Sequence, residues 1–182
     1  MADQPTDKPK DKVLTVTRVL LQIMQGFLIF GGVMIALVLP VLWIKRTEVL
    51  AELAKNMAPT VPGTESLIAI SLIMLGGFAM LAIGFAFIKR IIAIIDTVVT
   101  DTPFVPVNAK RLREMGWLVV ATQGLALLML PIAVWIEAQL PKGNDLGIEV
   151  SIEALLSAML LFILAQVFDH GTRLAEDVEG TV

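Results

Sequence analysis

Few side chains in this sequence have the types and spacing that catalysis requires. The single histidine, His170, follows Asp169, and the chain has no cysteine, so a thiol nucleophile and a Cys-ligated metal site are both excluded. Ser157 and His170 are 13 residues apart, which in a helix is about 20 Å and too far for a nucleophile and its base. Glycine-rich phosphate loops and the HExxH zinc motif are absent. We therefore expect no enzyme activity, no cofactor and no metal.

Positive charge gathers in the segment 101–117, DTPFVPVNAKRLREMGW. Pro106 suits the first position of a helix, and residues 108–115 predict a short basic helix that leads into the membrane at Trp117. Such a helix can bind anionic lipid headgroups or dock an acidic partner, and its charges can equally serve only to fix the topology. The candidate docking residues of this segment are Asn108, Lys110, Arg111, Arg113 and Trp117.

Glutamines form the second candidate surface. Polar residues from Asp11 through Gln22 to Gln25 recur at spacings of 4, 3, 4 and 3, which places them on one helix face. The stripe continues as Ile29, Gly32 and Ala36, so it predicts a helix-packing seam, with a polar groove for a substrate as the alternative. The candidate intramembrane polar residues are Gln22, Gln25, Gln123 and Gln166.

The elements that must position these residues are membrane spans. The chain is 57% hydrophobic and 17% charged, and its apolar residues gather in four blocks that contain no charge. Because a charge at the centre of a bilayer costs about 2.5 to 3.5 kcal/mol, such blocks predict transmembrane helices. We predict an all-α polytopic membrane protein, a four-transmembrane-helix bundle with helical extensions into the cytoplasm. A disordered cytoplasmic tail (1–12) precedes one membrane domain (13–182) with spans at about 19–44, 67–88, 116–136 and 148–168.

Finer features follow from spacing. The helix of the second span is expected to continue past Lys89 and Arg90, and a short surface helix is expected between the first two spans. Small residues at helical spacing predict two packing faces. They are Ala69, Gly76, Ala79 and Ala86 in the second span, and Ser151, Ala154, Ala158, Leu161 and Ala165 in the fourth.

The distribution of basic residues predicts the topology. Of the 14 Lys and Arg residues, 10 lie on the side of both termini and the 101–117 loop, and 4 lie on the other side. Cytoplasmic loops carry the positive excess. Both termini and the 101–117 loop are therefore expected in the cytoplasm.

Two segments resemble a known family. PFVPVNAKRLREMGW and LAQVFDHGTRLAEDVEGTV are similar to motifs of domain-of-unknown-function family 2975, which comprises small four-span bacterial membrane proteins, and the resemblance extends over about residues 10–182. Val105 and Val107 depart from the family, whose members often carry Thr and Glu there, so a hydroxyl N-cap before Pro106 is missing. The resemblance implies a bacterial inner membrane and a frequent genomic pairing with a Cro/CI-type helix-turn-helix regulator. It adds Phe168, Gly171 and Leu174 to the candidate docking residues.

Two hypotheses about function remain. The first is a regulatory or interaction protein that docks a cytoplasmic partner, such as that regulator, through the 101–117 loop and the C-terminal helix, without binding nucleic acid itself. The alternative is a small transporter or channel subunit with a polar path near Gln22, Gln25 and Gln123.

Overall fold

The computed structural model describes residues 9–56, 63–99, 105–139 and 146–179, and these contain helices and no strand. Four of the helices are long and apolar enough to cross a membrane, which confirms the all-α, four-span prediction. The short surface helix expected after the first span is also present. The helices are α1 (Pro9–Ile44), α2 (Arg46–Asn56), α3 (Thr64–Val99), α4 (Pro106–Glu137) and α5 (Ile152–Glu179).

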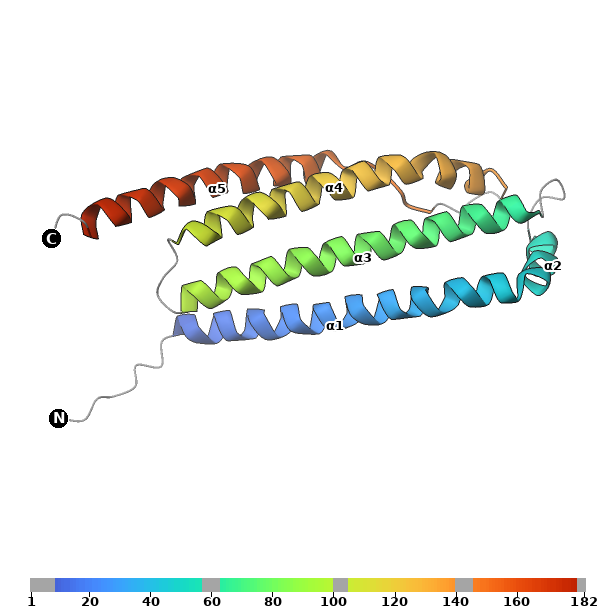
Figure 1. Ribbon diagram of the computed structural model, residues 1–182, viewed down its shortest axis with the longest axis horizontal. Helices are drawn as coiled ribbons and strands as arrows, with labels where there is room; N and C mark the ends of the chain where they lie inside the picture. The colour runs from blue at the N-terminus through green and yellow to red at the C-terminus, as the bar shows by residue number, and fades with distance from the viewer. Residues whose placement is uncertain (1–8, 57–62, 100–104, 140–145, 180–182) are drawn as a thin grey trace.

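The four long helices lie side by side in a row (Figure 1). α1 packs on α3, α3 packs on α4, and α4 packs on α5, while no comparable packing joins α1 to α4 or α5 among the described residues. The start of α1, the end of α3, the start of α4 and the end of α5 lie at one end of the row. We call this the termini end. α2 lies at the opposite end, where α1 turns towards α3.

The helices are longer than a bilayer requires. α3 has 36 residues, which is about 54 Å, whereas a hydrocarbon core is about 30 Å thick. Its charge-free block ends at Ile88, so Lys89 to Val99 continue the helix beyond the apolar layer, as the sequence predicts. The first turns of α4 precede its apolar block in the same way. The termini end therefore carries helix turns that bear charged residues beyond the charge-free blocks.

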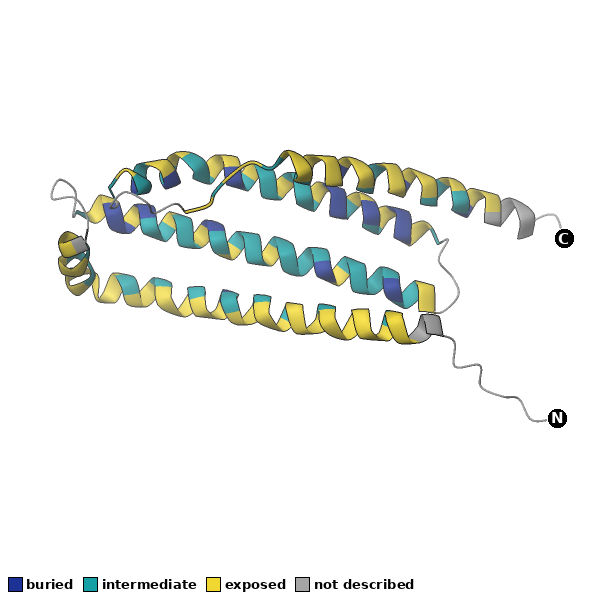
Figure 2. Ribbon diagram, turned by 180° about the vertical axis from the view of Figure 1, so that it is seen from behind, coloured by how far each residue is buried: buried dark blue, intermediate teal, exposed yellow. Residues whose placement is uncertain are grey.

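Side-chain burial is sparse, as expected for a chain whose outer surface contacts lipid. Figure 2 shows the buried residues concentrated on α3 and α4, whereas α1 is mostly exposed, with Phe27 at 71%. Of the predicted packing face of α5, Ala158 and Ala165 are buried at 2% and 1% exposure, Ala154 and Leu161 are partly buried, and Ser151 precedes the helix. On α3, Ala69 and Gly76 are buried, but Ala79 and Ala86 are only partly so.

Two predicted boundaries are wrong. The fourth span does not extend back to 148, because Ser151 Oγ accepts a hydrogen bond from the Ala154 amide at 3.1 Å and so caps a helix that begins at Ile152. Residues 146–151 are non-helical, and Gly147 has a φ of 64°. At the other end of the chain, α1 begins at Pro9, a residue suited to the first helical turn, so residues 9–12 are helical. Residues 1–8 of the expected tail lie outside the described residues.

Gly116 allows α5 to approach α4 closely. A Cβ at this position would lie 2.8 Å from the ring of Phe162, which stacks edge-on against Trp117 with ring centroids 5.6 Å apart. Gly124, two turns further along α4, has no atom within 4 Å of such a Cβ.

We expect Gly116→Ala to be less stable than Gly124→Ala by about 1 to 3 kcal/mol, because both gain the same helix propensity and only the first overpacks. Unfolding in detergent micelles measures the difference. Phe162→Leu should restore much of the loss in the Gly116→Ala background. Equal stabilities for the two alanine variants would contradict the close approach.

Candidate functional site

A polar network joins α3 to α4 at the termini end. Arg90 Nε donates to Glu114 Oε2 at 2.7 Å, at the level where both apolar blocks end. One turn further out, Arg111 Nη1 donates to the carbonyl oxygen of Ala93 at 2.9 Å. These two contacts join successive turns of α3 and α4, which run antiparallel, beyond their charge-free blocks.

Asn108 is the buried centre of this network, with 0% exposure. Its Nδ2 donates to Thr97 Oγ1 at 2.7 Å, and its Oδ1 accepts from Arg111 Nη1 at 2.8 Å. Thr97 Oγ1 in turn donates to the carbonyl of Ile94 at 2.7 Å. A buried amide without partners costs about 1 to 3 kcal/mol, so the hydrogen bonds of Asn108 stabilise the packing of α4 on α3.

The start of α4 brings Asn108 into this place. Pro106 occupies the first helical turn, and the N-cap Val105 has an extended backbone and no side-chain capping bond, as its side chain predicts. The Asn108 amide donates to the Val105 carbonyl at 2.9 Å, which closes the first turn. The Asp101–Phe104 part of the loop lies outside the described residues.

Polar side chains join α1 to α3 near both ends of the described helix pair. Arg18 pairs with Asp96 at 3.3 Å, and both side chains are nearly half exposed. At the opposite end, Trp43 Nε1 donates to Ser71 Oγ at 3.1 Å. An exposed ion pair contributes only about 0 to 1 kcal/mol, so α1 is held mainly by apolar contact with α3.

The candidate docking residues of the 101–117 segment fall into two groups. Asn108 and Arg111 point into the network, so they stabilise the helix pair and are not free for a partner. Lys110 and Arg113 are exposed and have no ion pair or hydrogen bond within the described chain. Trp117 is 62% exposed although it stacks on Phe162.

A basic groove lies between α3 and α4 beside the network, with a volume of about 350 Å³. Lys89 and Arg90 from α3 face Lys110 and Arg111 from α4 across it, with one carboxylate, Glu114. Lys89, Arg90 and Glu114 were not among the predicted site residues, because each lies beside an apolar block and serves equally well as a boundary charge.

The C-terminal candidates lie along α5. Phe168 and Gly171 are partly buried, and Leu174 is 65% exposed. Gly171 and Leu174 line a shallow depression of about 460 Å³ with Gln166 and His170 on the outer surface of this helix. Arg173 pairs with Asp169 at 3.0 Å on the neighbouring stripe.

The structure does not bring the glutamines together. Gln22 is exposed on α1, Gln25 is partly buried against α3, and Gln166 is exposed on α5. Gln123 lies on α4, where its Oε1 accepts a hydrogen bond from the Ser151 amide at 2.8 Å and so holds the start of α5. Because α3 separates α1 from α4, Gln25 and Gln123 share no cavity in the described part of the chain.

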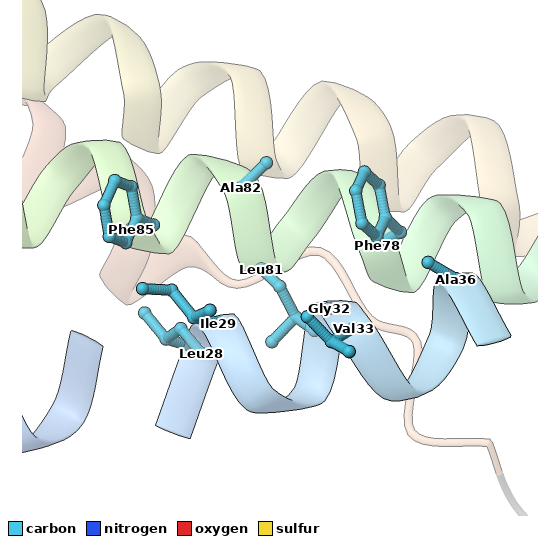
Figure 3. Close-up of a pocket in the computed structure, with 9 residues that line it drawn as sticks. All are labelled: Leu28, Ile29, Gly32, Val33, Ala36, Phe78, Leu81, Ala82 and Phe85. Carbon is cyan, nitrogen blue, oxygen red and sulfur yellow. The ribbon is translucent and has the colours of Figure 1, made fainter. Parts of the chain in front are cut away.

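The stripe that follows the α1 glutamines borders an apolar groove (Figure 3). Ile29, Gly32 and Ala36 face Phe78 and other α3 side chains across a space of about 430 Å³, and all of its lining side chains are apolar. Gly32 is buried and belongs to the seam, while Ile29 and Ala36 are exposed at its margin. The stripe is therefore a packing seam in part and leads to no polar path.

The residues considered for chemistry remain apart. Ser157 Oγ donates to the Glu153 carbonyl of its own helix at 2.8 Å, and His170 is exposed beyond it. Where the structure is described, no group of three or more His, Asp or Glu side chains could hold a metal ion.

One comparison with known proteins is informative. The sequence model of a family described as protein of unknown function (DUF2975) matches residues 51–182. This range contains α3, α4, α5 and part of α2, so it begins later than the expected residue 10 and leaves out α1. Neither the curated proteins nor the solved structures contain a match to the chain.

Asn108→Ala tests the polar network. We expect a loss of about 1 to 3 kcal/mol in the free energy of unfolding, because the change leaves Arg111 and Thr97 without their shared partner. Val107→Ala, at an exposed neighbouring position, should cost less than about 0.5 kcal/mol. Thermal unfolding in detergent compares the two variants. Similar losses would show that the hydrogen bonds of Asn108 do not stabilise the protein.

Proposed function

Because this chain belongs to the DUF2975 family of proteins of unknown function, we propose its role from the geometry of the termini end. The chain is a multi-pass membrane protein with four membrane-length helices. Our proposal is a regulatory protein of the bacterial inner membrane that docks a cytoplasmic partner on its polar extensions. It acts by binding and not as an enzyme.

The proposal is supported by the exposed face formed by Arg113 and Trp117 beside α5. Trp117 stacks on Phe162, and Arg113 lies one turn earlier on the same side of α4. His170 and Leu174 are exposed on α5, where they line a depression formed by residues of that helix alone. Arg and Trp are the residues that most often dominate binding energy at protein interfaces. We call the surface with Arg113, Trp117, His170 and Leu174 the α4–α5 face.

The partner that we propose is a small helix-turn-helix transcription regulator, held at the membrane through an acidic surface of its own. Arg113 supplies an unpaired charge for such a surface, whereas Arg111 is engaged within the chain. The membrane protein itself has no contact with DNA in this scheme. The transport alternative finds no support, because Gln25 and Gln123 lie on α1 and α4, which are separated by α3.

The orientation can be tested with single cysteines, since the chain has none of its own. Val107→Cys lies at an exposed position of the termini end, and Thr47→Cys lies at an exposed position of the opposite end. The positive excess of 10 to 4 predicts that a membrane-impermeant maleimide labels Val107→Cys only in inside-out vesicles, and Thr47→Cys only in intact cells or spheroplasts. The reverse pattern would place the termini end outside the cytoplasm.

Docking can be tested by crosslinking in native membranes. A photoreactive residue in place of the exposed His170 should crosslink to one soluble DNA-binding protein. Arg113→Gln should reduce this product about fivefold or more, since an interfacial arginine typically contributes over 1 kcal/mol. Mass spectrometry of the excised product identifies the partner and quantifies its yield.

Arg46→Gln is the matched control, because Arg46 is also exposed and unpaired but lies at the opposite end of the protein. It should leave the crosslinked product unchanged. Crosslinks only to lipid or to the chain itself, with no response to Arg113→Gln, would reject the docking function.

A further inference from the structure

The basic groove between α3 and α4 is a different surface from the α4–α5 face. We propose that it binds the headgroup phosphate of an anionic phospholipid. Arg113 is not among the residues that line the groove, so lipid binding there and partner docking on the α4–α5 face use different side chains.

The charges of the groove are unbalanced. Four basic side chains and one acidic side chain line it, which leaves a formal excess of three positive charges. Glu114 is already paired with Arg90 at 2.7 Å, and Lys89 and Lys110 are exposed without an ion pair or hydrogen bond in the described chain. Two ammonium groups that face a common groove, neither of them paired with its one carboxylate, are suited to phosphate oxygens, which accept charge-assisted hydrogen bonds.

The walls of the groove are fixed before a ligand arrives. Arg90 is held by Glu114 and by the carbonyl of Ala86, at 2.7 and 2.9 Å. Arg111 is held by Asn108 and by the carbonyl of Ala93, at 2.8 and 2.9 Å. Because these guanidinium groups are already ordered, binding has only the two lysine side chains to immobilise.

The depth of the groove favours a lipid over a soluble phosphate. Lys89 directly follows Ile88, where the charge-free block of α3 ends, and the groove reaches outward to Ala93. Five helical residues span about 6 to 8 Å, and the headgroup layer on each side of a bilayer is about 5 to 8 Å thick. The residues of the groove therefore span a depth similar to that of the headgroup layer.

Binding can be measured by native mass spectrometry on the full-length protein in detergent, titrated with phosphatidylglycerol or with zwitterionic phosphatidylcholine. The first phosphatidylglycerol should bind more tightly than phosphatidylcholine. Lys89→Gln and Lys110→Gln should each weaken it about fivefold, the factor expected for one basic residue near anionic lipid. The double variant Lys89→Arg/Lys110→Arg should keep the affinity, because it keeps both charges.

Two controls separate this site from general charge attraction and from the docking function. Lys45→Gln/Arg46→Gln removes two charges from the opposite end and should leave the first phosphatidylglycerol in place, as should Arg113→Gln. An equal loss in the Lys45/Arg46 variant, or no loss in the Lys89 and Lys110 variants, would overturn the proposal. So would displacement of the lipid by an equimolar amount of glycerol 3-phosphate, since the ligand would then be a soluble phosphate.

Discussion

The structure depends on the absence of water from the hydrocarbon layer. Each backbone polar group in that layer must be satisfied within the protein, and each charge must lie beyond the layer. Polar contacts between helices are found at the two ends of the row, in the network around Asn108 and between Trp43 and Ser71. One further contact lies midway along α4, where Gln123 accepts a hydrogen bond from the Ser151 amide. Between the ends, small residues set the distances. Gly116 against Phe162 and the buried Ala158 and Ala165 show how closely α4 and α5 approach.

Asn108 and Arg111 illustrate how the constraint divides the basic segment at the start of α4. Both were candidates for docking, yet their hydrogen bonds to Thr97 and Ala93 make them part of the α3–α4 junction. Lys110 and Arg113, on the remaining sides of the same helix, keep their charges exposed. One short basic stretch thus both stabilises the α3–α4 junction and presents exposed charge, since a helix distributes consecutive residues around its axis.

The sequence was sufficient for the features that arise from one helix at a time. Charge-free blocks predicted the four spans, and the spacing of Ala158 and Ala165 predicted the packing face of α5. Features that depend on two helices were not accessible in the same way. The pairing of Arg90 with Glu114 requires the register of α3 against α4, and the row arrangement requires knowing that, among the other long helices, α1 packs mainly on α3. The start of α5 was misplaced because its charge-free block, 154–168, is short for a membrane span and was extended back to about 148, whereas Ser151 caps the helix.

The long helices pack in a row and do not close into a ring, so side chains are buried only where neighbouring helices touch. In a closed ring of helices each member hides one face from lipid, but here both broad surfaces of the row, together with the outer edges of α1 and α5, are available to acyl chains. Lipid tails then supply the dispersion contacts that a second protein layer supplies in a soluble domain. The bilayer is in this sense a component of the fold, and exchanging it for a detergent changes the packing environment of this protein as a core substitution changes that of a soluble one.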